Sequence, residues 1–431
     1  MNFKESFLHF IWQYQLFEKS DLQTTDGESL AIIKQGLHNT NAGPDFQDAQ
    51  IILANVQWFG AVEIHTNSSD WQKHAHHHDQ AYEKVILHVV WNEDVKLMHN
   101  DGSPLPTLSL KGKIEKQYID KYQSLVEHRD IIPCAHYFTD IPEIVKFSML
   151  DRALHSRQEH KSEEIMQVLE ATNHNWEETT YRLLAKNFGF KVNAHPFLKL
   201  AENLPLKILL KHSSSLFQLE ALLFGVAGFL KNIETSDIYW NNLQKEYQFL
   251  KHKYDLENKE INLHEWKFLR LRPANFPTIR IAQFAQLIHQ HSNLFSLFTS
   301  FSEYKTFIKL LSIKQSAYWS EHYIFNTPSE KPTGRLGKSS IENIIINTVV
   351  PLLFALSKSK DELIFTEKAI TLLENLPAEQ NSITNTWLQL GFKNNNAFDS
   401  QASIELFNNY CDKRRCLECS IGTHIMKQLA V

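Results

Sequence analysis

The sequence has few cysteines, no long uninterrupted hydrophobic run and no large excess of charge of either sign. Only four of its 431 residues are cysteines, and three of them lie within the last 21 residues. This small number does not provide the disulfide framework of a small secreted domain. The close spacing of three thiols instead suits a bound metal or cluster.

Membrane segments are also lacking. No stretch reaches the roughly 18 uncharged apolar residues that a membrane-spanning helix requires. The apolar start of the chain is interrupted by Lys4, Glu5, His9 and Gln13. It therefore lacks the basic start, apolar block and small-residue cleavage site of a signal peptide. We expect a cytoplasmic protein that has no contact with a membrane.

The formal net charge is -5, which argues against a protein that wraps nucleic acid by bulk positive charge. A local basic groove is still compatible with this value. Hydrophobic residues make up 43% of the chain and charged residues 22%, as in ordinary soluble globular proteins. The length is sufficient for two domains of roughly 100–200 residues each.

The first hundred residues have the pattern of one helix followed by strands. Apolar residues recur every three or four positions over residues 7–17, which predicts an amphipathic helix whose apolar face holds Phe7, Phe10, Ile11, Tyr14 and Phe17. Asp-Gly pairs at 26–27 and 101–102 predict hairpin turns. Strands are predicted at 49–54, 59–66 and 85–91, the last of them buried on both faces, with a short helix at 79–85. With the short β-prone runs on either side of residues 26–27 included, the order is helix, three strands, helix, strand.

From about residue 112 onward, long helical patterns dominate. Asn175 is a suitable N-cap for the helix that follows it. We find no repeat of fixed period, and residues 325–340 have the composition of an exposed loop. The fold class is therefore predicted as α+β, with an α/β domain at residues 1–111 and an all-helical domain at residues 112–431.

Two acidic residues, Asp45 and Glu63, are the main candidates for a metal site. Asp45 follows Pro44 in a turn before one strand, and Glu63 lies on the next strand. Because side chains alternate along a strand, Glu63 and His65 should point to the same face, where Asp45 can meet Glu63. Two converging carboxylates suit a hard cation such as Mg²⁺. Alternatively, Asp45 only caps a turn and Glu63 is a solvated strand carboxylate.

The element order and the segments GPDF and VEIH resemble the core and the PD…ExK signature of the PD-(D/E)XK nuclease superfamily, over about residues 1–92. This resemblance implies a restriction-endonuclease-like core. It also implies that Asp45 and Glu63 bind Mg²⁺ or Mn²⁺, that the carbonyl of Ile64 completes the metal shell, and that Glu5 is an accessory acid. The metal would activate water for phosphodiester hydrolysis.

One position departs from the family signature, because His65 stands where the family has a lysine. A histidine titrates near pH 6.5, whereas a lysine is a fixed positive charge at neutral pH. His65 is expected to position the water, to act as a base or to bind metal. Lys73 and Lys84 are candidate substitutes for the missing lysine. The alternative is a site that is inactive or has been repurposed.

A histidine-rich stretch follows the strand that carries the second carboxylate. We take His74, His76, Asp79 and Tyr82 as candidate catalytic residues, because histidine is a common metal ligand and proton shuttle. In the nuclease superfamily, the helix after this strand often contributes polar residues to the active site. His74, His78 and Tyr82 follow one another at four-residue spacing and would share one helix face if the helix begins as early as His74. The alternative is an exposed helix entry with incidental histidines.

The same stretch is similar to the HxHxDH motif of metallo-β-lactamase-type hydrolases. The spacing differs, because Asp79 comes three residues after His76 and not two. The rest of that fold's pattern is absent. A small-molecule hydrolase that uses the histidines is therefore a minor third hypothesis.

The cysteines form a second candidate metal site. Cys411, Cys416 and Cys419 have the spacing C-x4-C-x2-C, and Cys134 is the one remaining thiol. Four thiolates suffice for Zn²⁺ or an iron–sulfur cluster, with His424 as another possible fourth ligand for zinc. The spacing resembles the plant-type ferredoxin run and the cluster of RecB-like nucleases, in which the upstream cysteine precedes the nuclease core. Basic residues at 413–415 favour thiolates. The alternative is three buried or free thiols.

Arginines and aromatic residues occur together in the segment RLRPANFPTIRI. Arg270, Arg272 and Arg280 suit contact with phosphates, and Phe276 suits base stacking. The same residues suit a proline-bounded structural loop, which is the interpretation we favour. The glycine-containing segment 334–340 lacks the spacing of a P-loop.

Nearly the full length of the chain resembles a bacterial family of unknown function, in segments that include GPDF, GAVEIHTNSSDW, HAHHHDQAYEKVILHVVW, FGFKVN and the C-terminal cysteine group. The leading hypothesis is a metal-dependent nuclease that acts on DNA or RNA. The rival hypothesis is a non-catalytic nucleic-acid-binding or scaffold protein on a decayed nuclease core. Nucleic acid is the expected partner, and protein partners are not specified.

Overall fold

A computed structural model describes residues 3–127, 130–231 and 235–428. The chain folds into two compact units. The first unit comprises residues 1–150 together with 406–431, and the second comprises residues 151–405. The boundary predicted at residue 111 falls inside the first unit, and the division into 1–111 and 112–431 stays a prediction. The C-terminal segment with three cysteines belongs to the same unit as the N-terminal sheet.

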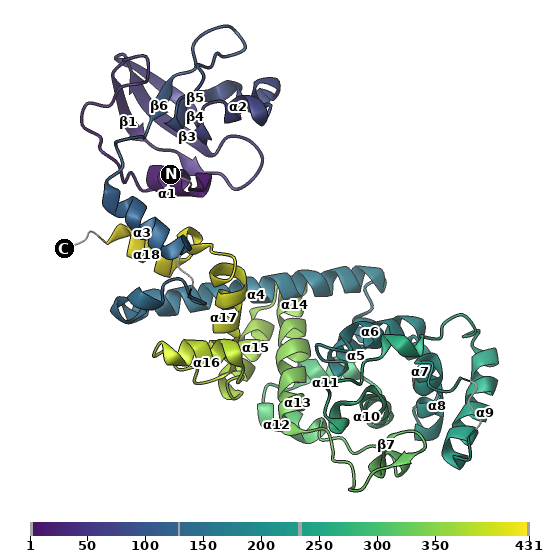
Figure 1. The fold of residues 1–431 in the computed structure, drawn as a ribbon. Helices are drawn as coiled ribbons and strands as arrows, with labels where there is room; N and C mark the ends of the chain where they lie inside the picture. Colours follow the sequence, from purple (N-terminus) through teal and green to yellow (C-terminus); the bar gives the residue numbers. More distant parts are fainter. Residues whose placement is uncertain (1–2, 128–129, 232–234, 429–431) are drawn as a thin grey trace. The chain divides into compact units, whose positions relative to one another are not determined.

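The first unit is built around a six-stranded mixed sheet (Figure 1). Its strand order is β1-β3-β4-β5-β6, and β2 pairs with β3. The strands are β1 (Leu30–Lys34), β2 (Leu37–His38), β3 (Phe46–Leu53), β4 (Val56–Asn67), β5 (Val85–Asn92) and β6 (Thr107–Ser109). Pairing is antiparallel from β1 to β4 and parallel from β4 to β6. The α+β class is confirmed, and the sheet contains the short strands β2 and β6 in addition to those predicted.

The register of β4 is set by its two neighbours. On one side, Ala54 and Asn55 form a two-residue turn between β3 and β4, and both have the positive φ of a type I′ hairpin turn. On the other side, Gly60 approaches β5 so closely that a Cβ would overlap the carbonyl oxygen of Lys84. The strand β5 is buried on both faces over residues 85–90, as its unbroken apolar run predicted.

One helix, α1 (Glu5–Gln13), packs against β4 through its apolar residues. Phe7, Phe10 and Ile11 are buried on this helix, as the sequence pattern predicted, but the helix ends at Gln13. Gln15 then adopts a positive φ of 53°, so Tyr14 and Phe17 lie beyond the helix. The polar side of α1 carries Glu5 and His9 toward the start of β3, where the candidate site lies.

The segment between β4 and β5 is broken into short pieces, namely α2 (Asp70–Lys73), η1 (His76–His78) and η2 (Gln80–Lys84). Ala75 has a positive φ of 58°, which ends α2, and Asp79 is extended. The prediction that His74, His78 and Tyr82 share one helix face is therefore wrong. The break instead allows His74 and His76 to turn toward the strand that carries His65.

The remainder of the first unit is helical. It contains α3 (Lys116–Glu127), η3 (Ala135–Asp140), the start of α4 (Glu143–Ala171), η8 (Phe407–Cys411), η9 (Cys416–Glu418) and α18 (Ser420–Lys427). The helices α3 and α18 lie side by side although they come from distant parts of the sequence (Figure 1).

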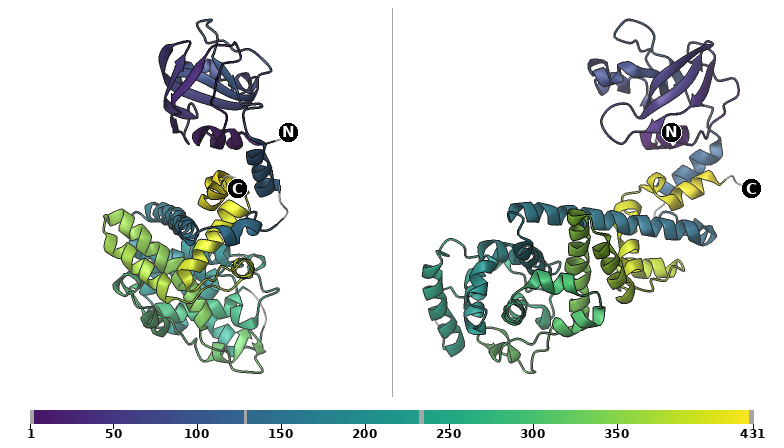
Figure 2. Two further views of the ribbon diagram at one scale, coloured as in Figure 1. Left: turned by 90° about the vertical axis from the view of Figure 1, so that its left-hand side faces the viewer. Right: turned by 180° about the vertical axis from the view of Figure 1, so that it is seen from behind.

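The second unit is almost entirely helical, as predicted for this part of the chain. Besides most of α4, its α-helices are α5 (Trp176–Phe188), α6 (Ala194–Asn203), α7 (Leu206–Leu210), α8 (Leu216–Val226), α9 (Ile238–Lys253), α10 (Pro277–Gln290), α11 (Leu294–Ser300), α12 (Tyr304–Leu310), α13 (Lys338–Ile344), α14 (Val350–Lys360), α15 (Leu363–Asn375), α16 (Ser382–Gln389) and α17 (Ala397–Leu406). The helix α10 is buried along most of its length and packs against α8 and α5 (Figures 1 and 2).

Two local predictions in this unit can be compared with the structure. Asn175 caps α5, because its side chain accepts hydrogen bonds from the amides of Glu177 and Glu178. The segment predicted as an exposed loop contains part of a small hairpin, β7 (His322–Ile324) and β8 (Thr327–Pro328), and its residues Thr333 and Leu336 are buried. The hairpin and the two buried side chains therefore hold this segment against the rest of the second unit.

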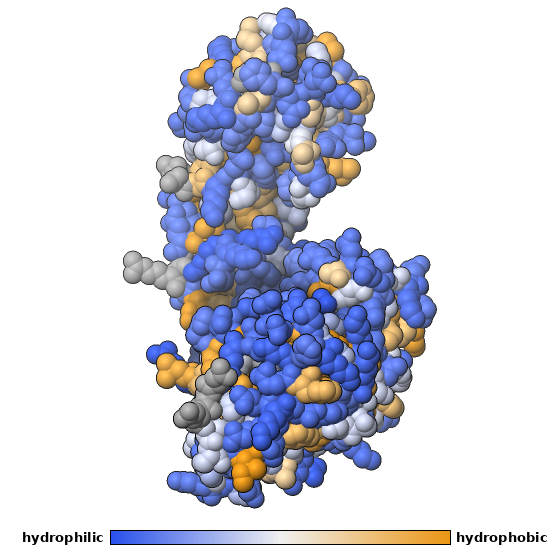
Figure 3. Space-filling view, turned by 90° about the vertical axis from the view of Figure 1, so that its right-hand side faces the viewer, coloured by the Kyte–Doolittle hydropathy of each residue, from blue (hydrophilic) through white to orange (hydrophobic). Residues whose placement is uncertain are grey.

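One continuous helical stretch, Lys338–Lys360, is long and apolar enough to meet the length and composition criteria for a membrane span. In its most apolar window, 67% of the residues are buried inside the protein, as in a core helix. The stretch comprises α13, a π-helical turn at Ile345–Val349 and α14. On the molecular face drawn in Figure 3, hydrophilic side chains predominate and hydrophobic ones occur in small groups.

Candidate functional site

The carboxyl groups of Asp45 and Glu63 lie beside each other at the point where β3 and β4 separate. The amide of Asp45 donates to Oε2 of Glu63 at 3.0 Å. In the opposite direction, the amide of Ile64 donates to Oδ2 of Asp45 at 2.9 Å. Because each acid is held by the backbone of the other strand, both side chains are fixed in place. The structure thus brings together the two acids that the sequence suggested as metal ligands.

The helix α1 adds two more polar groups to this pair. His9 Nε2 lies 3.2 Å from Asp45 Oδ2 and 3.8 Å from Glu5 Oε1. This nitrogen is buried. Burial acts to lower the pKa of His9, but the two carboxylates outweigh it and raise the pKa above its ordinary value. Sequence analysis did not select His9, although its four-residue spacing from Glu5 places both on one helix face.

The acids lack a fixed positive charge. Burial, followed by the charges of Asp45 and Glu5, raises the pKa of Glu63 to about 9. Burial also raises the pKa of Glu5. Within the described residues, the ion pairs of Asp45 and Glu63 are all to histidines. Lys73, a candidate substitute for the family's lysine, is exposed and pairs with Asp70 at 2.6 Å. A divalent cation at this place would supply the missing charge.

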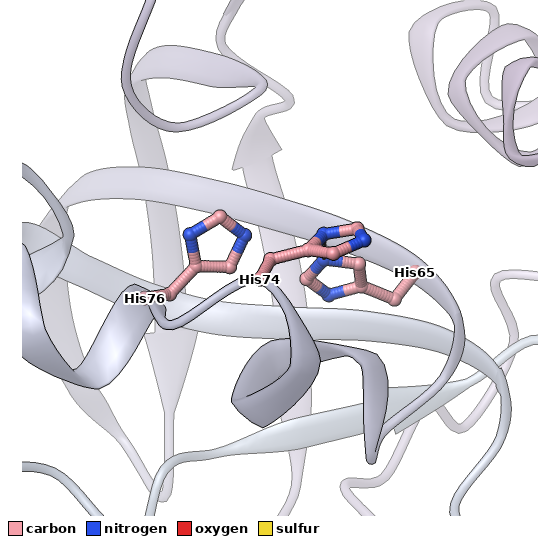
Figure 4. A group of neighbouring side chains, drawn as sticks. All are labelled: His65, His74 and His76. Carbon is pink, nitrogen blue, oxygen red and sulfur yellow. Dashed lines mark hydrogen bonds between the residues drawn. The ribbon is translucent and has the colours of Figure 1, made fainter.

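A group of histidines lies directly beside Glu63. His65 comes from β4, His74 follows α2, and His76 begins η1 (Figure 4). One ring nitrogen from each lies within 4.8 Å of the others. His65 Nε2 is 3.2 Å from His74 Nδ1, and His76 Nε2 is 3.2 Å from Glu63 Oε1. Glu63 therefore links the group of acids to the group of histidines.

A further histidine lies behind His65, away from the acids. The Nδ1 atom of His65 is 2.8 Å from Nε2 of His88, which comes from β5. Burial, followed by neighbouring histidines, lowers the pKa values of both His65 and His88 to about 3. Both rings are therefore neutral at physiological pH. Sequence analysis missed His88, but a histidine within an apolar strand in register with Glu63 was a usable signal.

The remaining candidates of the histidine stretch divide into two kinds. The ring of Tyr82 stacks on that of His76 with centroids 3.8 Å apart. Burial and then the charge of Glu63 raise the pKa of Tyr82 to about 12, so its hydroxyl stays protonated. Asp79 is exposed, and its carboxylate accepts from the amide of Ala81 at the start of η2. Asp79 thus acts as a helix cap in this structure.

A groove of about 840 Å³ opens beside His76 and Tyr82. Its lining includes the partly exposed aromatic residues Trp58 and Phe59. The charged residues that line it are one lysine and four acids, namely Lys84, Glu28, Asp79, Glu83 and Asp101. The groove gives a molecule from solvent access to the histidine end of the site, but its charge is predominantly negative.

The four cysteines, Cys134, Cys411, Cys416 and Cys419, are all buried, none is in a disulfide, and they line one small cavity in the first unit. His424 does not line this cavity and contacts Gln428 instead. Burial raises the pKa of Cys416 to about 12 and shifts those of Cys134 and Cys411 further upward. The nearby basic residues therefore do not make these thiols acidic, contrary to our expectation.

Arg280 in the second unit has a structural role. Its guanidinium group donates to Asn275 Oδ1, Gln283 Oε1 and Ser340 Oγ, and it lies over the ring of Phe190. The group is buried, so it does not present a cation to a phosphate. The structural interpretation of this segment holds for Arg280, whose partners are amide and hydroxyl oxygens.

The fold and the site together define a two-unit α+β protein whose sheet carries a partly buried carboxylate–histidine cluster. The family described as "Protein of unknown function (DUF2851)" matches residues 5–382, and the chain belongs to this family. Neither the curated proteins nor the solved structures contain a match to the chain.

Proposed function

We propose that the protein is a metal-dependent phosphodiesterase that cleaves DNA or RNA. The observation that supports this most directly is the contact between the partly buried Asp45 and the buried Glu63, with Glu5 nearby and no lysine or arginine within 4.0 Å of either acid in the described residues. The order of elements and the PD…ExH residues resemble PD-(D/E)XK nucleases, which adds to this support.

The residues present fit a hard divalent cation. Asp45 and Glu63 would hold Mg²⁺ or Mn²⁺, together with the carbonyl of Ile64, and Glu5 would act as an accessory acid. The raised pKa of Glu63 fits a carboxyl group that lacks its positive partner. When bound, such a cation activates water and stabilises the negative charge that develops on the phosphate.

The histidines supply the proton chemistry in this proposal. His65 stands at the position of the lysine of PD-(D/E)XK nucleases, 3.7 Å from Glu63 Oε1. Because it is buried and neutral, it can accept a hydrogen bond from the attacking water and orient it, but it cannot act as a fixed positive charge. His74, 3.2 Å away, is exposed and can pass a proton from this water to solvent. His76 and Tyr82 close the side that faces the groove.

The test is a cleavage assay with the full chain on labelled single- and double-stranded DNA and RNA, with Mg²⁺ or Mn²⁺ and with a chelator. Asp45→Ala and Glu63→Ala should abolish cleavage while folding survives. Glu83→Ala removes an exposed acid from the same groove and should leave cleavage unchanged. Cleavage that is equal in all three variants would contradict the assignment, and so would wild-type protein that is inactive on every substrate.

A second candidate function is non-catalytic binding of nucleic acid, or scaffolding, on a decayed nuclease core. Two observations favour it. The position of the nuclease superfamily's lysine is held by the neutral His65. The adjacent groove is lined by four acids and one lysine, so it repels phosphates and favours a scaffold over a binder of nucleic acid. In this case, Asp45→Ala and Glu63→Ala would leave binding to nucleic acid unchanged in a gel-shift assay, and no variant would differ in cleavage.

We also propose that the protein works in the cytoplasm. The longest apolar helix, Lys338–Lys360, has most of its apolar window buried inside the protein. Fractionation of cells that express the tagged full chain would test this proposal, and recovery with the membranes after a high-salt wash would contradict it.

A further inference from the structure

We infer that Cys134, Cys411, Cys416 and Cys419 form a four-thiolate metal site in the first unit, separate from the carboxylate–histidine cluster. This inference does not depend on the phosphodiesterase proposal. Cys134 precedes η3, Cys411 ends η8, Cys416 begins η9 and Cys419 precedes α18. Every cysteine of the chain therefore lies at an end of a short helix, and all four lie around one cavity.

The composition of the cavity fits a soft metal and little else. Apart from the cysteines, it is lined by Pro133, Tyr410 and Gly422. None of the four thiols is in a disulfide. Four thiols around one small space supply the ligand set of a tetrahedral zinc site or of an iron–sulfur cluster. Thiols that served only as small hydrophobic groups would have no reason to gather from distant parts of the sequence.

The backbone of the C-terminal segment is bent around the cavity that its three thiols line. Arg414 adopts a positive φ of 54°, and its amide donates to the carbonyl of Cys411 at 3.1 Å. The amide of Cys419 donates to the carbonyl of Cys416 at 3.3 Å. A Cβ at Gly422 would overlap this same carbonyl of Cys416, so only glycine permits the close return of α18.

The site also contains a positive charge. Nη2 of Arg414 donates to the carbonyl of Asp130 at 2.9 Å, which ties the C-terminal segment to the loop that carries Cys134. Nη1 of Arg414 is buried without a hydrogen bond. This guanidinium group acts on Cys411 and Cys416, where it favours the thiolate form. It would offset part of the negative charge that four thiolates leave on a bound metal.

The ligands come from two separate segments of the first unit, namely the loop before η3 and the segment that contains η8, η9 and the start of α18. A metal bound to all four thiols would hold these two segments together.

Zinc and an iron–sulfur cluster share this ligand chemistry, and metal analysis separates them. The full chain is purified anaerobically and analysed for zinc, iron and acid-labile sulfide, together with its visible absorption spectrum. We expect stoichiometric zinc without colour, or iron with sulfide and a brown colour. Cys134→Ser and Cys416→Ser should lose the metal. His424→Ala, which changes a residue of α18 outside the cavity, should keep the metal.

Three results would overturn the inference. The first is wild-type protein without metal after growth with both metals and after anaerobic reconstitution. The second is a Cys134→Ser variant that keeps its full metal content. Because a serine variant can fail to fold, the wild type is also titrated with an organomercurial reagent. Metal release should follow thiol modification, and metal that stays bound after all thiols have reacted would equally overturn the inference. Asp45→Ala should keep the cysteine-bound metal, which separates this test from that of the proposed activity.

Discussion

The rings of His65 and His88 are joined directly, with Nδ1 of His65 2.8 Å from Nε2 of His88. One of these two nitrogens must carry the proton between them. For His65 to bind a metal or accept a proton through Nε2, its own proton must be on Nδ1, so that His88 is the acceptor. In this arrangement, His88 fixes the tautomer of His65, and the unbonded Nδ1 of His88 carries the remaining proton.

A metal ion can also be held by the ring nitrogens of His65, His74 and His76, next to Glu63. His88 is therefore expected to be a positioning residue for metal binding at these histidines. His88→Leu removes the acceptor and should weaken Mn²⁺ binding by about 10–100-fold, the usual effect of losing such a partner. His88→Gln retains an acceptor oxygen and should keep most of the affinity. Calorimetric titration with Mn²⁺ is the suitable measurement, because this ion prefers oxygen and nitrogen ligands to the cysteine thiolates.

The control for this experiment is His78→Ala, which changes an exposed histidine outside the group. It should bind Mn²⁺ as the wild type does. If His88→Leu bound Mn²⁺ with unchanged affinity while His65→Ala weakened it, then His88 would not set the tautomer. Unfolding temperatures of all variants would show whether any loss comes from unfolding.

Glu63 is expected to destabilise the metal-free protein and to stabilise the metal-bound protein. Its folded pKa is raised to about 9, above the ordinary value of 4.5. Stability from this group is therefore greatest below pH 4.5 and is lost as the pH rises toward 9. In the presence of a chelator at neutral pH, Glu63→Gln should be more stable by roughly 1–3 kcal/mol, because glutamine keeps an acceptor for the Asp45 amide without the charge.

Added Mn²⁺ should reverse this order. Binding to the native state alone raises the stability of the wild type, whereas Glu63→Gln lacks one of the proposed ligands. Thermal unfolding with chelator and with excess Mn²⁺ checks both halves of the prediction. A variant that is less stable than the wild type in chelator would mean that Glu63 already has a positive partner in the fold.

The carboxylate pair could be predicted from the sequence because it depends on local rules. Alternation along β4 places Glu63 and His65 on one face, and the turn before β3 places Asp45 at its mouth. The Asp-Gly turns and the buried strand β5 were predictable for the same reason. These features need only the neighbouring residues and the pairing of adjacent strands.

The remainder of the site depends on contacts that the sequence does not encode locally. Nothing in the sequence around Ala75 indicates a left-handed residue, yet this conformation turns His76 toward Glu63. His9 and His88 join the site because α1 packs on β4 and β5 lies beside it. Cys134 is similar, because its place beside the C-terminal thiols depends on the fold of the whole first unit.

Close packing of α8 against α9 gives a prediction about stability. A Cβ at Gly225 would overlap the ring of Tyr247, which is buried. Overpacking of this kind costs about 1–3 kcal/mol, and the better helix propensity of alanine returns about 1 kcal/mol. Gly225→Ala should therefore lower the free energy of unfolding by up to about 2 kcal/mol in denaturant titrations.

The matched control is Gly334→Ala. No atom lies within 4 Å of a Cβ at Gly334, and its φ is not in the left-handed region. Its free energy of unfolding should stay within about 0.5 kcal/mol of the wild type. Equal effects of the two substitutions would show that α8 and α9 do not pack as closely as the structure has them.

Glu220 gives a prediction about pH. It lies on α8 and is 1% exposed. The hydroxyl of Tyr239 donates to its Oε2, but its Oε1 is buried without a hydrogen bond. In the described residues, no lysine or arginine forms an ion pair with it. Burial is the main cause that raises its pKa from 4.5 to about 7.

The raised pKa means that the folded state binds a proton more tightly than the unfolded state. Stability from this group is complete below pH 4.5, falls as the pH rises to about 7, and is then constant. Glu220→Gln keeps an acceptor for Tyr239 but cannot ionise. The variant should gain stability relative to the wild type across this range, by an amount on the order of 2–3 kcal/mol at the upper end.

Urea unfolding at several pH values between 4.5 and 8 would measure this difference. Glu163→Gln, which changes an exposed acid on α4, should show no such trend. If the curves for wild type and Glu220→Gln ran parallel, Glu220 would titrate alike in the folded and unfolded states. Because a buried acid without a positive partner cannot titrate in this way, parallel curves would place a cation or water beside Oε1.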